Sequence, residues 1–285
     1  MAGAAGSWPT DWRTRLRVGG QSLLAPILAR RAARRAARPP RRFHAFAVGL
    51  PRSGTHSLAA MFEGRFRAAH EPALVDTLAH TMSWNRGERT RARMGALLRW
   101  RDRRLGLELE AAHYLHHLTP LLVEQFPDAR FVLSIRDPIS WLDSEINQNL
   151  RSARYPFWQA IEAQRYGRYG FDFPEAERGL AAAGCPHPVA SYLCYWRDHI
   201  QEVLAAVPAD RLLVLRTHEL DQRVTELADF FGVDVDGIDR TRSRSGVGEG
   251  RPVDLLGSVD ADHLRREVAR HCVGLASEWF PGPTR

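Results

Sequence analysis

One short stretch, from Phe46 to Phe62, constrains the fold more than any other part of the chain. It reads FAVGLPRSGTHSLAAMF: an apolar run, a loop with glycines, and then a helical pattern. A buried strand that leads through a tight loop into a helix is typical of a parallel sheet. The first turn of such a helix presents backbone N–H groups without acceptors at the positive end of the helix dipole. The stretch therefore predicts an anion-binding loop.

The loop departs from the common nucleotide phosphate loop GxxxxGK[ST] in an informative way. Gly49 and Gly54 occupy the two glycine positions, but Thr55 and His56 follow where a lysine and a hydroxyl residue belong. The positive charge lies instead on Arg52, ahead of the second glycine. We therefore expect the loop to hold an anion without relying on magnesium.

A second segment, residues 131–144 with the sequence FVLSIRDPISWLDS, predicts another anion site. Its apolar half reads as a strand that ends at Arg136. Asp137 and Pro138 favour a helix start immediately afterwards. Ser144 lies eight residues after Arg136, about two turns into this helix.

Both motifs, PRSGT and the Arg136–Ser144 pair, resemble those of sulfotransferases that use 3′-phosphoadenosine 5′-phosphosulfate (PAPS). The chain is similar to the bacterial or Golgi-like members of that family. The resemblance implies two separate pockets, one for the 5′-phosphosulfate and one for the 3′-phosphate, and no metal. The residues implied to bind PAPS are Arg52, Ser53, Gly54, Thr55, His56, Ser57, Arg136, Ser144 and Thr217.

The resemblance also implies a function and a fold. The function is transfer of a sulfuryl group to a hydroxyl-bearing acceptor (a small molecule, natural product, sugar or glycolipid), with adenosine 3′,5′-bisphosphate (PAP) as the other product. The fold is a single-domain, three-layer α/β/α arrangement around a central parallel sheet. Apolar runs alternate with helical patterns, as such a sheet requires. The predicted strands cover 44–49, 66–70, 105–109, 130–135 and 211–215, and the clearest predicted helix covers 188–207.

Two residues compete for the role of general base, and Arg52 is expected to stabilise charge on the leaving group. Glu71 ends a strand-like run at the position where a subset of the family has a catalytic glutamate. His113 lies close to where cytosolic members have a catalytic histidine, and an imidazole suits proton transfer near neutral pH. We rank Glu71 first and His113 second.

We expect other roles for four further polar residues. Glu110 would orient the acceptor or hold an adjacent arginine. His70 would point to the opposite face of its strand from Glu71, since side chains alternate along a strand. His116 and His117 lie in a helical pattern, and we expect them to be solvated rather than metal ligands.

Three positions depart from the cytosolic members of the family. Ser57 replaces an aromatic residue that stacks on adenine, and Thr217 replaces a tyrosine that contacts it. The glycine- and lysine-rich C-terminal phosphate loop is missing. Residues 241–254 would substitute for it, through one of three arginines at positions 242, 244 and 251.

Charge and composition divide the chain. Residues 1–42 hold ten arginines and one aspartate, a net charge of +9. The whole chain has a net charge of +7, so residues 43–285 carry −2. We expect 1–42 to be a solvated extension or a peripheral contact with anionic membrane. Residues 43–285 would form the sulfotransferase domain. Its aromatic-rich segment, about 145–188, would be either a cap over the acceptor or a satellite core.

The remaining features set limits on function. The chain has no lysine, which excludes a catalytic lysine, and its three cysteines have no disulfide or metal spacing. No apolar run reaches the ~20 residues of a membrane span, so we expect a cytoplasmic protein. Arginine abundance alone is weak evidence for an anionic partner, and we expect no nucleic acid. A P-loop kinase-like phosphotransferase and a non-catalytic, membrane-associated anion binder remain alternatives.

Overall fold

The computed structural model describes residues 38–152, 156–245 and 254–281. Most of the arginine-rich segment 1–42 lies outside the described residues, and so does its expected membrane contact. Arg41 and Arg42, at the end of that segment, form ion pairs with Asp102 and Glu108. None of the described helices has the length and apolar character needed to cross a bilayer.

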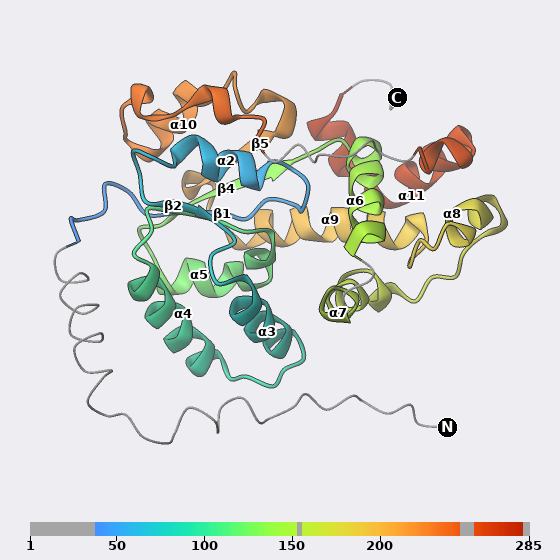
Figure 1. Ribbon diagram of the computed structural model, residues 1–285, viewed down its shortest axis with the longest axis horizontal. Coiled ribbons are helices and arrows are strands. Elements are labelled where there is room, and N and C mark those ends of the chain that lie inside the picture. Colours follow the sequence, from blue (N-terminus) through green and yellow to red (C-terminus); the bar gives the residue numbers. More distant parts are fainter. Residues whose placement is uncertain (1–37, 153–155, 246–253, 282–285) are drawn as a thin grey trace. The chain divides into compact units, whose positions relative to one another are not determined.

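Within the described residues, the strands form one parallel sheet in the order β2-β3-β1-β4-β5 (Figure 1). β1 lies in the middle, pairing Phe46 with Glu110 of β3 and with Phe131 of β4. The predicted anion-binding loop therefore leaves the centre of the sheet. The strands are β1 (Ala45–Ala47), β2 (Ala68–His70), β3 (Leu109–Ala111), β4 (Arg130–Ile135) and β5 (Leu212–Arg216).

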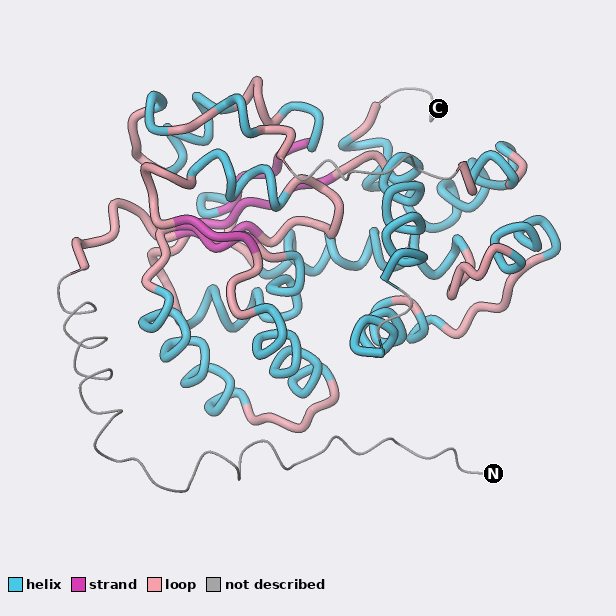
Figure 2. The backbone as a smooth tube through the Cα atoms, viewed as in Figure 1, coloured by secondary structure: helices cyan, strands magenta, loops and turns pink. Residues whose placement is uncertain are grey.

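Helices cover both faces of the sheet, which confirms the predicted three-layer α/β/α arrangement (Figures 1 and 2). Alternation along β1 supplies both layers: Phe46 belongs to one buried apolar cluster, and Ala45 and Ala47 belong to the other. One face carries α2 (Thr55–Phe62) and α10 (Val224–Phe231). The other carries α3 (Leu74–Asn85), α4 (Arg91–Leu105), α5 (Thr119–Gln125) and α9 (Val189–Ala206).

A further group of helices lies beyond the sheet, and two of them, α6 and α7, supply one wall of the candidate site described below. α6 follows β4 directly and packs against both α9 and α11. The group consists of α6 (Pro138–Ser152), α7 (Pro156–Arg165), α8 (Arg178–Ala182) and α11 (Ala261–Trp279).

The sequence located most elements but misplaced one strand. The predicted helix 188–207 matches α9, and the predicted strand 130–135 matches β4. The third strand was expected at 105–109 but lies at Leu109–Ala111. The reason is that α4 continues through Leu105 and ends at Gly106, whose φ of 62° is the left-handed conformation that closes many helices.

Candidate active site

Two glycines shape the loop between β1 and α2. Gly54 has a φ of +93°, and a Cβ atom there would lie 2.8 Å from Leu220 Cδ1. Gly49 lies so close to β4 that a Cβ atom would come within 1.9 Å of Ser134 Oγ. A larger residue at either position would displace its neighbours. The glycine spacing noticed in the sequence therefore has a steric cause.

Side chains beneath the loop hold its backbone in place. The buried Ser53 hydroxyl donates to the carbonyl of Leu50 at 2.6 Å. The Thr217 hydroxyl donates to the carbonyl of Ser53 at 2.8 Å, and Trp141 Nε1 donates to the carbonyl of Pro51 at 2.8 Å. Ser53 and Thr217 thus fix the loop through their hydroxyls, and the roles expected of them toward PAPS stay predictions.

The first turn of α2 contains no acidic residue. The Thr55 hydroxyl shares a 3.2 Å hydrogen bond with His70 Nε2, and Ser57 donates to the carbonyl of Ser245 at 2.7 Å. His56 is exposed at the pocket surface. The first backbone N–H groups of a helix have no intrahelical acceptor, so this end of α2 suits an anion.

Arg52 and Arg136 bring two positive charges to the same place. Arg52 Nε donates to Ser144 Oγ at 3.2 Å, and Arg136 Nη1 donates to the carbonyl of Arg52 at 3.5 Å. Burial lowers the pKa of Arg136, and the neighbouring Arg52 charge lowers it further. A bound anion would relieve this repulsion. The two separate pockets expected from the sequence are therefore one, because Arg52 reaches across to the helix that carries Ser144.

All five strands contribute to a pocket of about 710 Å³ at their carboxyl ends. Arg52 follows β1, Glu71 follows β2, His113 follows β3, Arg136 follows β4 and Thr217 follows β5. Ligands commonly bind at this edge of an open parallel sheet. Of the nine residues implied to bind PAPS and the two candidates for the base, Ser53 is the one that does not line it.

Strained backbone marks two of these residues. Arg52 and Glu71 have φ values of 60° and 47°, and Ala73 has 54°. A residue with a Cβ atom in this left-handed region costs roughly 1–2 kcal/mol, and such strain is concentrated at functional sites. The turn at Glu71 is held by Arg101, whose Nη2 donates to the carbonyl of Pro72 at 2.8 Å.

Glu71 and His113, the two candidates for the base, form a pair. His113 Nδ1 lies 2.6 Å from Glu71 Oε1, and His113 Nε2 contacts Arg165 Nη2. A guanidinium can only donate, so Nε2 accepts from Arg165 and Nδ1 carries the proton that is donated to Glu71. Both imidazole nitrogens are thereby occupied. The other carboxylate oxygen of Glu71 is the atom of this pair that remains to accept a proton from a ligand.

The electrostatic surroundings keep Glu71 ionised. Burial alone would raise the pKa of this carboxyl group, but His113, His70 and Arg165 together lower it to about 2. Glu71 is thus a carboxylate across the physiological pH range. Arg165, a buried residue at the end of α7, was not identified from the sequence. One indication of Arg165 is present in the sequence: it follows Glu162 by three positions on α7, which places both residues on one face of the helix.

The structure contradicts the expectation for His70 and decides between the two expectations for Glu110. His70 was expected on the opposite face from Glu71, yet both line the pocket, with His70 Nε2 3.8 Å from Glu71 Oε1. The reason is that β2 ends at His70, and the left-handed turn at Glu71 interrupts the alternation. Glu110 forms a buried ion pair with Arg101, so of its two expected roles it has that of holding an arginine.

The expectation that His116 would be solvated is wrong. His116 is buried, and His117 is partly buried. The 3₁₀ segment that contains them, His113–Leu118, packs against α9 rather than facing solvent.

Polar side chains outnumber aromatic ones where the 145–188 segment faces the pocket. Tyr166 is buried and donates to Glu145 Oε1 at 2.6 Å, while Tyr169 and Phe173 pack against the main apolar cluster. Most of these aromatic residues therefore belong to a core. Trp158, one of the aromatic residues of the expected cap, does line the pocket. The other pocket-lining residues of this segment, which the sequence did not single out, are Glu145, Asn147, Gln148, Asn149, Arg151, Glu162 and Arg165.

The arginines expected to complete the 3′-phosphate site do not all line the pocket. Arg244 lines the pocket. Arg242 instead forms a 2.9 Å ion pair with Glu63. Position 251 lies outside the described residues.

Comparison with known proteins gives one family match and several distant likenesses. Residues 45–239 match the family model described as "Sulfotransferase domain". The chain is 29% identical over 115 residues to "Ava biosynthesis cluster protein M" from Aspergillus versicolor, covering 38% of this chain and 44% of that protein. The chain thus spans less than half the length of that curated relative.

Three solved structures show limited similarity. The sulfotransferase from Alicyclobacillus acidocaldarius is 18% identical, with 82% of this chain and 94% of that chain covered and a TM-score of 0.40. Sulfotransferase STF9 from Mycobacterium avium is 15% identical, with coverages of 86% and 79% and a TM-score of 0.45. The sulfotransferase domain of the Synechococcus PCC 7002 olefin synthase is 15% identical, with coverages of 78% and 82% and a TM-score of 0.36.

Proposed function

The chain belongs to the sulfotransferase family, and we propose that it transfers a sulfuryl group from PAPS to a hydroxyl group of a polar small-molecule, natural-product or sugar acceptor. One observation carries the proposal. The carboxylate–imidazole pair of Glu71 and His113 lines the same pocket as the guanidiniums of Arg52 and Arg136. The reaction needs a proton acceptor and an anion site within reach of each other, and this pocket offers both.

The donor fits the positive side of the pocket. We assign the 5′-phosphosulfate to Arg52 and the first turn of α2, and the 3′-phosphate to Arg136 and Ser144. Charge-assisted hydrogen bonds from arginine to such oxygens are among the stronger polar contacts in proteins. The repulsion between the two guanidiniums supports this assignment, since a polyanion would neutralise it.

Glu71 acts on the acceptor in this proposal. Its carboxylate takes the proton of the acceptor hydroxyl while the acceptor oxygen bonds to sulfur and the bond from sulfur to the 5′-phosphate oxygen breaks. PAP is released as the second product. Arg52 stabilises the negative charge that develops on the leaving oxygen. His113 Nδ1–H donates a hydrogen bond to Glu71 and so orients the carboxylate.

The polar lining supports a hydroxyl-rich acceptor. Asn147 and Asn149 come from α6, while Trp158 and Glu162 come from α7. Amides and carboxylates satisfy hydroxyl groups, and an aromatic ring packs on the apolar face of a sugar ring.

The test is a transfer assay with ³⁵S-labelled PAPS over sugars, glycolipids, phenols and aliphatic alcohols. We expect labelled product with the hydroxyl-rich acceptors. In parallel, PAP should raise the melting temperature, whereas ATP with Mg²⁺ should not. Protection by ATP–Mg²⁺ alone would favour the kinase-like alternative. A full-length protein that binds PAP but transfers nothing to any acceptor would favour the non-catalytic one.

A further inference from the structure

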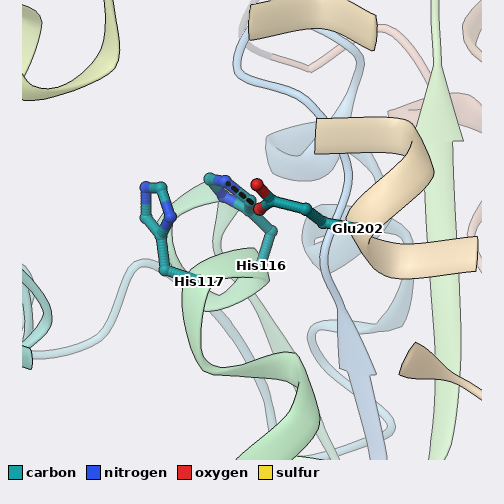
Figure 3. A group of neighbouring side chains, drawn as sticks. All are labelled: His116, His117 and Glu202. Carbon is teal, nitrogen blue, oxygen red and sulfur yellow. Dashed lines mark ion pairs between the residues drawn. The ribbon is translucent and has the colours of Figure 1, made fainter. Parts of the chain in front are cut away.

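A second group of chemically reactive side chains lies outside the pocket, between the 3₁₀ segment His113–Leu118 and α9. His116, His117 and Glu202 each offer one ligand atom, and these atoms all lie within 4.8 Å of one another (Figure 3). His116 Nε2 lies 3.7 Å from Glu202 Oε2. Two imidazole nitrogens and a carboxylate oxygen are the ligands of many zinc sites.

The tautomer of His116 is fixed in the form that a metal requires. His116 Nδ1 lies 2.9 Å from the carbonyl oxygen of His113. A carbonyl can only accept, so Nδ1 carries the proton and Nε2, the atom near Glu202, carries a lone pair. Histidine ligands to metals generally donate their other N–H group to a backbone carbonyl or a carboxylate in this way.

The His116 ring is also held rigidly. It stacks on His199 with ring centroids 3.8 Å apart and an interplanar angle of 19°. His199 is itself fixed, because its Nε2 donates to the carbonyl of Val48 at 2.7 Å. The His117 ring lies with its centroid 3.6 Å from that of His116. Prior ordering of the ligands reduces the entropy lost when an ion binds.

Two arginines lie near the three residues, and each also contacts another group. Arg168 Nη2 lies 3.9 Å from Glu202 Oε1, but it lies closer to Asp198 Oδ2, at 3.1 Å. Arg165 contacts His113 on the side of the pocket. Glu202 Oε2, the oxygen near His116, is therefore available to a cation.

We propose that His116, His117 and Glu202 bind one divalent transition-metal ion, with zinc as the best match to two imidazoles and a carboxylate and with water as a further ligand. None of the three residues lines the transfer pocket. The ion therefore has a structural role: it fastens the segment that begins with His113 to α9. This inference does not depend on the proposed transfer reaction.

The test uses full-length protein without an affinity tag, stripped with a chelator and then titrated with Zn²⁺ against a chromophoric competitor. We expect one ion per chain and a higher melting temperature. Co²⁺ should give visible absorption bands of a nitrogen- and oxygen-ligated site. Glu202→Gln and His117→Ala should each weaken Zn²⁺ binding by about tenfold or more, since even changes in residues that only support metal ligands have effects of that size.

A matched control is available on α11. Glu267 and His271 form another glutamate–histidine pair, 3.2 Å apart, without a third converging ligand in the described part of the chain. Glu267→Gln should leave Zn²⁺ affinity unchanged. The proposal is overturned if Zn²⁺ does not bind stoichiometrically, or if Glu202→Gln binds it as tightly as Glu267→Gln. Circular dichroism establishes whether each variant is folded. If His117→Ala does not fold, Glu202→Gln decides the result, because it preserves side-chain volume.

Discussion

His113 Nδ1 donates to Glu71 Oε1 across 2.6 Å, so the two residues that competed for the role of base act as one unit. Arg165 contacts the other imidazole nitrogen and determines which nitrogen carries the proton. A neutral imidazole oriented in this way can support the carboxylate, but it has no lone pair left to offer a ligand. In the proposed reaction the two residues therefore have distinct roles, and the predictions below depend on that difference.

The first prediction separates the two roles. Glu71→Gln should lower kcat by about 10²–10⁴-fold, the usual contribution of a general base, with PAP affinity unchanged. His113→Asn should have a smaller effect, about 10–100-fold, as for a residue that orients another. Initial rates with labelled PAPS and PAP titration measure both. Glu88→Gln, at an exposed pair with Arg86, is the control. Full turnover in Glu71→Gln together with none in His113→Asn would reverse the assignment.

The second prediction concerns pH. The folded-state pKa of Glu71 is lowered from 4.5 to about 2, although burial opposes this change. The wild-type rate should therefore show no loss from protonation of Glu71 between pH 7 and pH 5. In His113→Ala burial prevails, and the acidic limb of the kcat profile should move upward. Coincident acidic limbs in the two proteins would contradict the pairing.

The same shift has a consequence for stability. Because the folded-state pKa lies below the ordinary one, ionised Glu71 stabilises the fold fully above about pH 4.5. That contribution is lost as the pH falls toward 2. Denaturation midpoints between pH 3 and pH 6 should fall more gradually in His113→Ala than in wild type.

The third prediction tests the loop by comparing two glycines. Gly54→Ala and Gly87→Ala both place a Cβ atom at positive φ, +93° and +71°, and both should destabilise the fold by roughly 1–2 kcal/mol. Only at Gly54 does the new Cβ atom meet a neighbour, Leu220 Cδ1. Gly54→Ala should therefore also lose PAP affinity, whereas Gly87→Ala should not. Calorimetric titration and urea denaturation measure the two effects, and equal PAP affinity in both variants would refute the steric explanation.

The fourth prediction separates charge from strain at Arg52. Arg52→Gly and Arg52→Ala both remove the guanidinium, so each should weaken PAP binding by about tenfold or more, as expected for a charged hydrogen bond worth ~1.5–3 kcal/mol. Glycine adopts a φ of 60° without the cost that alanine incurs. Arg52→Gly should thus be the more stable of the two by about 1 kcal/mol. Equal unfolding free energies would show that the backbone here is not strained.

The fifth prediction concerns Arg165 as a positioning residue. Arg165→Gln keeps an N–H donor for His113 Nε2 but loses the charge, and we expect kcat to fall while PAP affinity stays the same. The acidic limb of the kcat profile should move upward, because Arg165 is one of the groups that lower the pKa of Glu71. Arg165→Lys, which restores the charge, should return the limb toward wild type. An unchanged limb in Arg165→Gln would remove Arg165 from this role.

The sequence predicted those parts of the site that depend on local pattern. The loop at Gly54 and the Arg136–Ser144 pair could be identified because strand, turn and helix follow one another within a few residues. The length of α9 followed from its helical period. Each of these features is determined by neighbours along the chain.

Features that depend on distant segments were not accessible in this way. Pairing of Glu71 with His113 requires β2 and β3 to be neighbours, and sequence order does not state that. Arg165 reaches His113 from α7 across 52 positions. The third strand was misplaced because the apolar run at Leu105 suits a helix end as well as a strand, and the left-handed Gly106 decides between them.

Helix α6 carries Ser144, which is bonded to Arg52, directly beside Glu145, which is bonded to Tyr166. A helix behaves as a stiff rod, so a rotation of α6 that moves one of these two side chains also moves the other. In the proposed reaction, a substitution that tilts α6 to suit a new acceptor therefore also alters affinity for the nucleotide. Divergence toward new acceptors is consequently easier through residues on α7.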